Sequence, residues 1–358
     1  MNVKEPIGHG ILGAGSIARV HSDVSKRVGF ELVAVSDIKE QNAQMFAEWK
    51  GAKRSYPDYA KLLQDPEIDL VSICLPNFLH AQWAVKAAKA NKHVICEKPI
   101  CMNFKELSEI KKAVDVSGTR FFYAEELCYI PAFVKAKEII DQGAIGEVIY
   151  VRQREMHAGP YSLWFFEPEQ AGGGALVDMG CHGIGLVNWL CGMAPKRVFA
   201  RIDRLLHKDI KVDDYALVLI EYANGALGIS ESGWCLKEAK CESTLEVFGT
   251  RGVIKTSVAP YTQVQIFSEE GYGMAPELTK GYSWDYSDEY WELGYEGEFK
   301  HFKECLLKGE RETTGLAEAE LVLEIMMAAY HSCSRESWVD LPFKPEVRYP
   351  LELIGWEL

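Results

Sequence analysis

Two separate stretches of the sequence carry ionisable side chains in contexts that favour acid–base chemistry. The first is the run 94–99 (VICEKP), in which β-branched residues favour a buried strand and the proline, which lacks an N–H, ends it. A lysine at the carboxyl end of a parallel strand points into the crevice where open α/β sheets bind ligands. Charged loop residues are usually solvated, so Glu97 and Lys98 taken alone could also be an exposed pair.

Asp178 and His182 form the second group, shortly after three consecutive glycines. The pattern predicts a helix over residues 175–191 that ends at Gly192. Side chains four positions apart share a helix face, and the dipole at a helix N-terminus favours a carboxylate and disfavours a protonated imidazole. We therefore expect Asp178 to be ionised and His182 to be able to accept a proton. An incidental pair on a structural helix is the alternative.

A metal site is a further possibility, because Asp178, Cys181 and His182 all carry ligand atoms. No other ligand pair with zinc-like spacing accompanies them in the sequence, so we predict no metal. The ten cysteines are scattered without a Cys-x-x-Cys pair, a pattern typical of reduced thiols in the cytoplasm.

The elements that would position these groups begin with a short apolar strand over residues 7–12, followed directly by GAGSIA. This G-x-G-x-x-A pattern between a strand and a helix is the fingerprint of dinucleotide-binding turns. Gly13 allows the tight turn, and Gly15 lets a pyrophosphate approach the backbone. The anion would bind at the helix N-terminus that Ser16 and Ile17 begin.

Asp37 follows a second apolar strand, over residues 30–36, and lies about 20 residues after the glycine turn. An acid at this position binds the adenosine ribose through its 2′-hydroxyl and repels a 2′-phosphate. The sequence therefore predicts NAD, with NADP as the less favoured cofactor because Lys39 is nearby. As a helix cap alone, Asp37 would need no ligand.

Strands and helices alternate through the first half of the chain, which predicts a doubly wound, parallel α/β sheet. From residue 197 onward, short strands joined by tight turns such as Asn224-Gly225 indicate antiparallel neighbours. We predict an NAD(P)-binding Rossmann domain over residues 1–125. An α+β domain with an open, mainly antiparallel sheet is predicted over residues 126–358, for substrate binding and oligomerisation. Residues 268–294 are expected to be irregular and rich in aromatic side chains.

The composition excludes several classes of partner. A net charge of -13 without a basic stripe argues against nucleic acid, whose phosphates require concentrated positive charge. No apolar run reaches the ~18 residues of a membrane span, and the N-terminus lacks the pattern of a secretory signal. We therefore expect a cytoplasmic protein that acts on a small molecule.

Taken together, these motifs resemble the Gfo/Idh/MocA oxidoreductases, a family named for glucose–fructose oxidoreductase and inositol dehydrogenase. The resemblance rests on GAGSIA at 13–18, Asp37, LPNFLH at 75–80, CEKP at 96–99 and the D-x-x-x-H pattern at 178–182. It implies a nicotinamide cofactor, a sugar, inositol or related polyol as substrate, and a cis Lys98–Pro99 peptide bond. It also implies a homodimer or homotetramer.

The resemblance further implies roles for individual residues. The implied cofactor contacts are Gly13, Gly15, Ser16, Ile17, Asp37, Leu75, Pro76, Asn77, His80, Glu97 and Lys98. The implied catalytic residues are Lys98, Asp178 and His182. We predict that these three also contact the substrate, together with Glu126, His157 and Trp164. Trp164 belongs to an aromatic cluster that could line a pocket or simply pack. Gly185 stands where relatives often carry an acid, and Glu126 and Cys128 stand where many carry Asn and Arg, so no particular sugar can be transferred.

We predict hydride transfer between nicotinamide and a secondary alcohol or ketone. His182 would be the general base, Asp178 would orient it, and Lys98 would stabilise the alkoxide. Glu97 would fix Lys98 or the nicotinamide ribose. A lysine or tyrosine as proton acceptor stays open. Two alternative functions are an NAD-dependent glycosidase or lyase with transient oxidation of its substrate, and a non-catalytic NAD-binding regulator.

Overall fold

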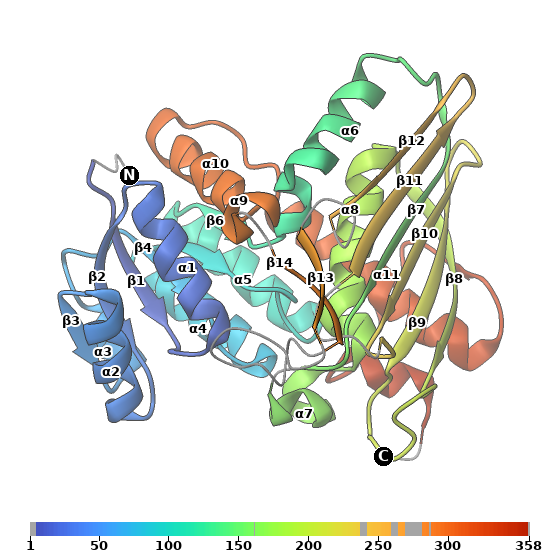
Figure 1. Ribbon diagram of the computed structural model, residues 1–358. Coiled ribbons are helices and arrows are strands. Elements are labelled where there is room, and N and C mark those ends of the chain that lie inside the picture. Colours follow the sequence, from blue (N-terminus) through green and yellow to red (C-terminus); the bar gives the residue numbers. More distant parts are fainter. Residues whose placement is uncertain are drawn as a thin grey trace. The chain divides into compact units, whose positions relative to one another are not determined.

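The chain forms two compact units, seen here in a computed structural model that describes residues 5–160, 162–236, 242–258, 264–268, 281–285 and 288–356. The first unit comprises Met1–Glu126 and Gly294–Glu320, and the second comprises Leu127–Leu293 and Leu321–Leu358. Residues 294–320 thus belong to the first unit although they follow most of the second in sequence (Figure 1). None of the helices within the described residues is long and apolar enough to cross a lipid bilayer.

The first unit is built on a six-stranded parallel sheet with the order β3-β2-β1-β4-β5-β6. Its strands are β1 (Gly8–Leu12), β2 (Glu31–Ser36), β3 (Arg54–Tyr56), β4 (Leu70–Ile73), β5 (His93–Cys96) and β6 (Phe121–Tyr123). The central strands are buried along their whole length, as expected for a sheet covered on both faces. The predicted doubly wound fold is therefore confirmed.

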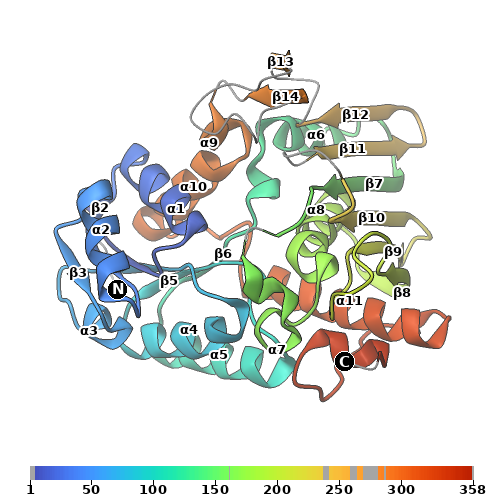
Figure 2. The same ribbon diagram turned by 60° about the horizontal axis from the view of Figure 1, so that its bottom comes forward.

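Helices cover both faces of this sheet (Figure 2). One face carries α1 (Ser16–Arg27), α2 (Glu40–Lys50) and α10 (Tyr295–Lys308), and the other carries α3 (Tyr59–Leu63), α4 (His80–Lys89) and α5 (Phe104–Ser117). The strand order reverses between β1 and β4, and open α/β sheets bind ligands at the carboxyl ends of strands flanking such a reversal.

The second unit contains a seven-stranded mixed sheet with the order β12-β11-β7-β10-β9-β8-β15. Its strands are β7 (Val148–Met156), β8 (Pro195–Asp203), β9 (Tyr215–Tyr222), β10 (Leu227–Gly233), β11 (Glu242–Gly249), β12 (Val253–Ser257) and β15 (Val339–Asp340). Neighbours run antiparallel except β7 and β10, which run parallel. The predicted open, mainly antiparallel sheet is confirmed.

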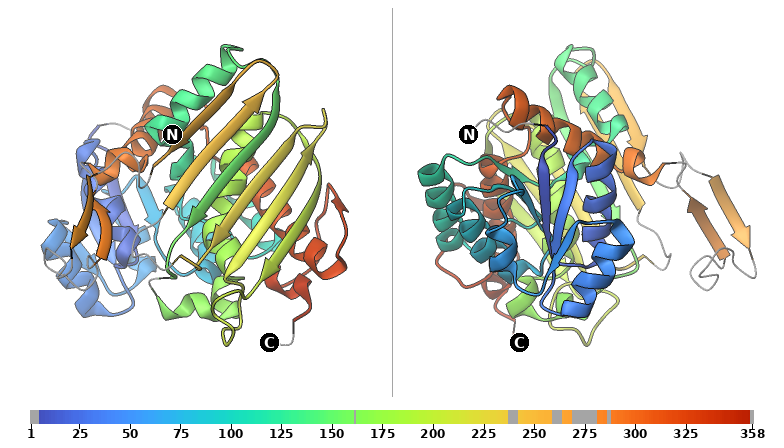
Figure 3. Two further views of the ribbon diagram at one scale, coloured as in Figure 1. Left: turned by 45° about the vertical axis from the view of Figure 1, so that its right-hand side comes forward. Right: turned by 90° about the vertical axis from the view of Figure 1, so that its left-hand side faces the viewer.

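One face of the mixed sheet carries the longer helices of this unit, and the left view of Figure 3 looks onto the opposite face. These helices are α6 (Pro131–Asp141), α8 (Cys181–Cys191) and the part of α11 (Leu316–Arg335) from residue 321 on. Alternate residues of β9 are buried, which matches a sheet packed on helices on one side.

Shorter elements complete the two units. They are η1 (Asn77–Leu79), η2 (Glu126–Tyr129), η3 (Leu163–Phe166), α7 (Pro168–Ala171), η4 (Leu176–Gly180), the antiparallel pair β13 (Val264–Ser268) and β14 (Gly281–Asp285), α9 (Glu289–Glu292) and η6 (Pro350–Ile354). The stretch predicted to be irregular, 268–294, thus contains β14 and α9. Residues 269–280 and 286–287, and Tyr161 of the aromatic loop, lie outside the described residues.

Candidate active site

The turn after β1 contains two glycines, and the structure gives a different reason for each of them. Gly13 has a φ of +98°, and its amide donates to the Ser36 carbonyl over 2.8 Å. A Cβ at Gly13 would lie 2.2 Å from the Cys74 carbonyl oxygen, so the turn itself requires glycine. In contrast, apart from Gly15 itself, its chain neighbours and the backbone of its own helix, no described atom lies within 4 Å of the position of a Cβ at Gly15. The packing of the chain does not require this glycine, and the open space beside it lets a ligand approach the backbone.

Helix α1 begins at Ser16, with Gly15 as its N-cap. No side chain of the described residues caps this end, and the first turn holds no acidic residue. The first amides, with the positive end of the helix dipole, are therefore suited to an anion such as a pyrophosphate.

Asp37 lies beside this turn at the end of β2. Its Oδ2 accepts a hydrogen bond from the Ala14 amide over 3.1 Å, and its Oδ1 accepts one from the Lys39 amide over 2.9 Å. The carboxylate is thus fixed against the glycine turn, where the sequence predicts that it binds a ribose.

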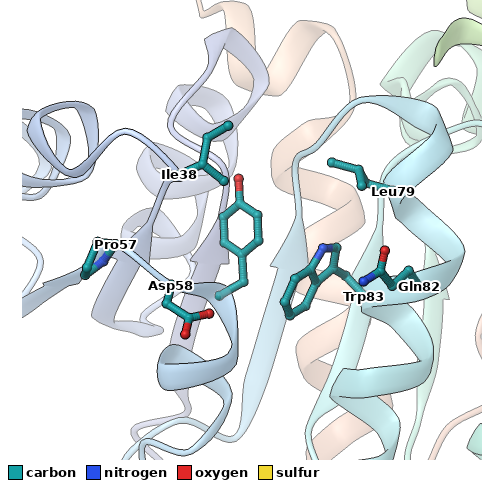
Figure 4. Close-up of a pocket in the computed structure, with 7 residues that line it drawn as sticks. Ile38, Pro57, Asp58, Leu79, Gln82 and Trp83 are labelled. Atoms are coloured by element: carbon teal, nitrogen blue, oxygen red, sulfur yellow. The ribbon is translucent and has the colours of Figure 1, made fainter.

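A pocket of about 300 Å³ lies next to Asp37 in the first unit (Figure 4). It is lined by Ile38, Pro57, Asp58, Tyr59, Leu79, Gln82 and Trp83. Ile38 stands on one side of the pocket, and Leu79 and Trp83 stand on the other. The Tyr59 and Trp83 rings meet edge to face with centroids 4.9 Å apart, and burial raises the pKa of Tyr59 to about 12. A cavity with apolar and aromatic walls suits a flat heteroaromatic ring.

The buried His80 supports the loops that follow β4 and β5. The two ring nitrogens of His80 each lie 2.7 Å from a backbone carbonyl, that of Leu75 and that of Pro99. Burial lowers the pKa of His80, although both carbonyl contacts oppose this shift. His80 therefore ties the predicted cofactor loop 75–77 to the segment that carries Lys98.

Glu97 and Lys98 follow β5 directly, and the Lys98–Pro99 bond is cis, as the resemblance implied. Glu97 uses both carboxylate oxygens within the first unit. Its Oε1 lies 2.8 Å from Nε2 of His21, and its Oε2 accepts from the Lys98 amide over 3.2 Å. His21 was not among the site residues predicted from the sequence, although its position three residues after the glycine motif, on the buried face of α1, was a signal for it.

Glu126, another predicted substrate contact, also belongs to the first unit. Its Oε1 accepts a hydrogen bond from the Tyr295 hydroxyl over 3.3 Å. The neighbouring Glu298 is fully buried, and this burial raises its pKa well above the ordinary value, with the charges of Glu126 and Glu97 adding to the shift. Burial thus favours the protonated form of this carboxyl.

The second unit positions Asp178 and His182. The predicted single helix over 175–191 is a π-helical turn, η4, followed by α8, so Asp178 lies in the π turn and His182 in the first turn of α8. Helical turns of this kind are rare and occur frequently at functional sites. Both side chains are buried, with 6% and 3% of their surfaces exposed.

Asp213 anchors the start of this helical segment. Its two oxygens accept hydrogen bonds from the amides of Gly174 and Leu176, each over 2.8 Å, and the Tyr330 hydroxyl donates to Oδ1 over 2.6 Å. A Cβ at Gly173 would lie 2.2 Å from the Tyr330 hydroxyl oxygen, and one at Gly174 would lie 1.8 Å from the Asp213 carbonyl oxygen. Two of the three consecutive glycines therefore make room for the anchor.

Two side chains hold the Asp178 carboxylate. Trp234 donates its indole N–H to Oδ2 over 3.0 Å, and Nε2 of His157 lies 3.5 Å from the same oxygen. Nδ1 of His157 accepts from the Gly159 amide over 3.0 Å, so Nε2 is the nitrogen that carries the proton in the neutral ring. The structure thus directs His157, a predicted substrate contact, toward Asp178.

The parallel pairing of β7 and β10 explains this arrangement. Met156 pairs with Gly233 at the ends of these strands, so the next residues, His157 and Trp234, leave the sheet side by side. Trp234 was not among the site residues predicted from the sequence, because only the non-local strand pairing reveals its position.

The predicted aromatic cluster surrounds Trp234. The Trp164 and Phe165 rings stack with centroids 3.8 Å apart, while Phe165 and Phe166 meet Trp234 edge to face at 6.4 and 5.9 Å. Trp164 is therefore connected to Asp178 through aromatic packing, and its predicted contact with substrate stays a prediction.

Most of the chain is similar to known protein families. Residues 7–125 match the family described as "Oxidoreductase family, NAD-binding Rossmann fold", and residues 133–255 match the GFO/IDH/MocA C-terminal domain. The chain is 33% identical to the uncharacterized oxidoreductase ORF334 of Rhizobium meliloti over 68% of this chain and 72% of the relative. It is 26% identical to the myo-inositol 2-dehydrogenase of Thermotoga maritima over 93% of this chain and 98% of the relative.

The crystal structure of GenD2 from gentamicin A biosynthesis, in complex with NAD, has a TM-score of 0.89 and 27% sequence identity to this chain. The similarity covers 96% of this chain and 98% of that one. Together with the two family matches, these likenesses confirm the predicted cofactor class and enzyme class. The chain belongs to the Gfo/Idh/MocA family of oxidoreductases, with an NAD-binding Rossmann domain.

Proposed function

We propose that the protein is an NAD-dependent dehydrogenase that oxidises a secondary alcohol of a sugar, inositol or related polyol, or reduces the corresponding ketone. The observation that carries the proposal is the buried Asp178 carboxylate, held by Trp234 and His157 one helical turn before His182. A carboxylate fixed beside a histidine is suited to stabilise the charge that the histidine gains when it takes a proton.

The cofactor fits the first unit of this chain. In the proposal, the pyrophosphate binds at Gly15 and the first turn of α1, Asp37 accepts from the 2′-hydroxyl of the ribose, and the pocket beside Ile38 takes the adenine. The carboxylate of Asp37 would repel a 2′-phosphate, which favours NAD over NADP. When bound, the nicotinamide supplies the acceptor or donor of the hydride.

Three side chains of the protein then accept the hydroxyl proton and stabilise the charges that this transfer creates. His182 accepts the hydroxyl proton as the hydride leaves, a step worth about 10²–10⁴-fold for a general base. Asp178 keeps the imidazole oriented and offsets its new charge. Lys98 donates to the substrate oxygen and stabilises its alkoxide character.

The substrate class is supported by a relative that is named as a myo-inositol 2-dehydrogenase. We also propose a cytoplasmic homodimer or homotetramer. The free cysteines of the described residues fit a reducing compartment, and the face of the mixed sheet opposite its helices offers a surface for a second copy.

The test is absorbance at the NADH band over a panel of inositols, sugars, anhydrosugars and aminoglycosides, with NAD and NADP in parallel. We expect turnover with NAD that falls at least 100-fold in His182→Asn and Lys98→Met, while His331→Asn and Lys89→Met stay within twofold of wild type. Absence of turnover with either cofactor would contradict the proposal. Cleavage of a glycoside without net NADH would favour an NAD-dependent glycosidase instead.

A further inference from the structure

A continuous line of hydrogen bonds crosses the interior of the first unit and ends at Glu97. It begins at Ser25 on α1, whose hydroxyl oxygen lies 2.8 Å from Nδ1 of His9 on β1. Nε2 of His9 lies 2.8 Å from the hydroxyl oxygen of Ser72 on β4, which lies 2.9 Å from Nδ1 of His21 on α1. Nε2 of His21 completes the line at 2.8 Å from Oε1 of Glu97.

The chemistry of the partners gives this line one direction. A carboxylate only accepts hydrogen bonds, so Nε2 of His21 must carry a proton. Nδ1 of a neutral His21 then accepts from the Ser72 hydroxyl, and Ser72 in turn accepts from Nε2 of His9. Nδ1 of His9 accepts from Ser25 in the same way. Every donor in the line therefore points toward Glu97, and each group is paired without a second charge.

The line is closed off from water. Ser25, His9, Ser72 and His21 are fully buried, and Glu97 is 7% exposed. The Phe299 ring of α10 meets both imidazoles edge to face, with centroid distances of 6.3 and 5.0 Å. Burial lowers the pKa of His9 to about 3, with the neighbouring His21 adding to the shift, so His9 is neutral at physiological pH.

We infer that His21 is a positioning residue for the reaction. Hydrogen bonds through Ser72, His9 and Ser25 hold its ring in place. It fixes Oε1 of Glu97, so that Oε2 holds the amide of Lys98 at the end of β5. The inference rests on the proposed function, because Lys98 matters there as the group that meets the substrate oxygen. A displacement of about 1 Å in such a group can cost about 10²-fold in rate.

The decisive comparison is His21→Leu with His21→Gln. Leucine removes both hydrogen bonds, whereas the glutamine amide can accept from Ser72 and donate to Glu97. We expect His21→Leu to lower kcat about 100-fold at saturating NAD and substrate, and His21→Gln to restore it to within about tenfold of wild type. His301→Gln changes a histidine of the same unit that pairs with Thr313, and it should leave kcat within twofold.

The inference would be overturned if the leucine and glutamine variants lost kcat equally while circular dichroism showed both to be folded. A wild-type kcat in His21→Leu would also overturn it. If His21→Leu does not fold, Ser72→Ala takes its place, with a fivefold or larger loss of kcat expected and an unchanged kcat contradicting the inference.

A spectroscopic measurement separates this inference from the proposed function. Long-range ¹H–¹⁵N spectra of histidine-labelled protein, assigned with His9→Gln and His21→Gln, report the tautomer of each ring without any turnover. Two neutral rings protonated at Nε2 support the line as described, even if the wild-type protein oxidises no substrate in the panel. A charged or Nδ1-protonated ring at either position would overturn it.

Discussion

Trp234→Phe is expected to impair catalysis without impairing cofactor binding. The substitution keeps an aromatic ring against Phe165 and Phe166 but removes the indole N–H that reaches Asp178 over 3.0 Å. A hydrogen bond to a charged group contributes about 1.5–3 kcal/mol, and 1.4 kcal/mol corresponds to a factor of ten. Because Asp178 is only 6% exposed, water cannot easily replace the lost donor. We therefore expect kcat to fall about 10- to 100-fold.

The KM for NAD separates this effect from general damage. The proposed cofactor contacts lie in the first unit and Trp234 in the second, so the KM for NAD should stay within twofold of wild type. Trp234 is fully buried, and the smaller ring should also lower the free energy of unfolding by about 1–3 kcal/mol, measured by urea denaturation.

Trp338→Phe is the matched control, because Trp338 lies in the same unit, is 37% exposed and packs against Phe199. It should leave kcat within twofold. The proposed role of the indole N–H would be contradicted if Trp234→Phe kept more than half of the wild-type kcat while losing stability, since the indole would then contribute only packing. It would also be refuted if Trp338→Phe lost as much kcat as Trp234→Phe.

The remaining predictions concern the glycine turn, Asp37 and His9 of the first unit. Gly13→Ala should fail to fold or should unfold at a much lower temperature, because its Cβ would lie 2.2 Å from a carbonyl oxygen. Gly15→Ala should keep the melting temperature of the wild type but lose NADH binding, measured by fluorescence. Equal melting temperatures in the two variants would contradict this distinction. Asp37→Ala should lower kcat/KM for NAD at least tenfold and raise it for NADP, so an unchanged ratio of the two values in steady-state kinetics would exclude the ribose contact. The His9 pKa of about 3 in the folded state lies below its ordinary value of 6.5, so the unfolded state binds the extra proton and stability falls as the pH falls below 6.5. At pH 5 this loss is about 2 kcal/mol, and urea unfolding of His9→Gln should show a correspondingly shallower acid slope than wild type, whereas identical slopes would refute the assignment.

Local sequence patterns were sufficient for much of the fold and for part of the site. The glycine turn, the acid after β2 and the lysine at the end of β5 are each encoded within one strand–loop segment, and alternation along the chain indicates a parallel sheet. In such a sheet, the carboxyl ends of strands meet at one edge. The positions of Gly13, Asp37 and Lys98 on that edge could therefore be predicted without the structure.

The supports of these residues could not be predicted in the same way. His21 meets Glu97, Asp213 anchors the helical segment before His182, and Trp234 meets Asp178, each across a long interval of sequence. Hydrophobic periodicity indicates which face of an element is buried, but it does not indicate which distant polar group lies opposite. The π turn at Asp178 could not be predicted either, because its sequence also satisfies the pattern of an α-helix.

The sequence by itself thus determined the class of fold, the cofactor class and the ionisable groups available for chemistry, because these depend on residue types and short-range spacing. Only the tertiary structure decided how those groups are held. The clearest case is the parallel pairing of β7 with β10, between strands distant in sequence, which brings His157 and Trp234 side by side onto Asp178. Short hairpins favour antiparallel neighbours, so such a pairing is settled by the packing of the whole sheet and not by any local pattern.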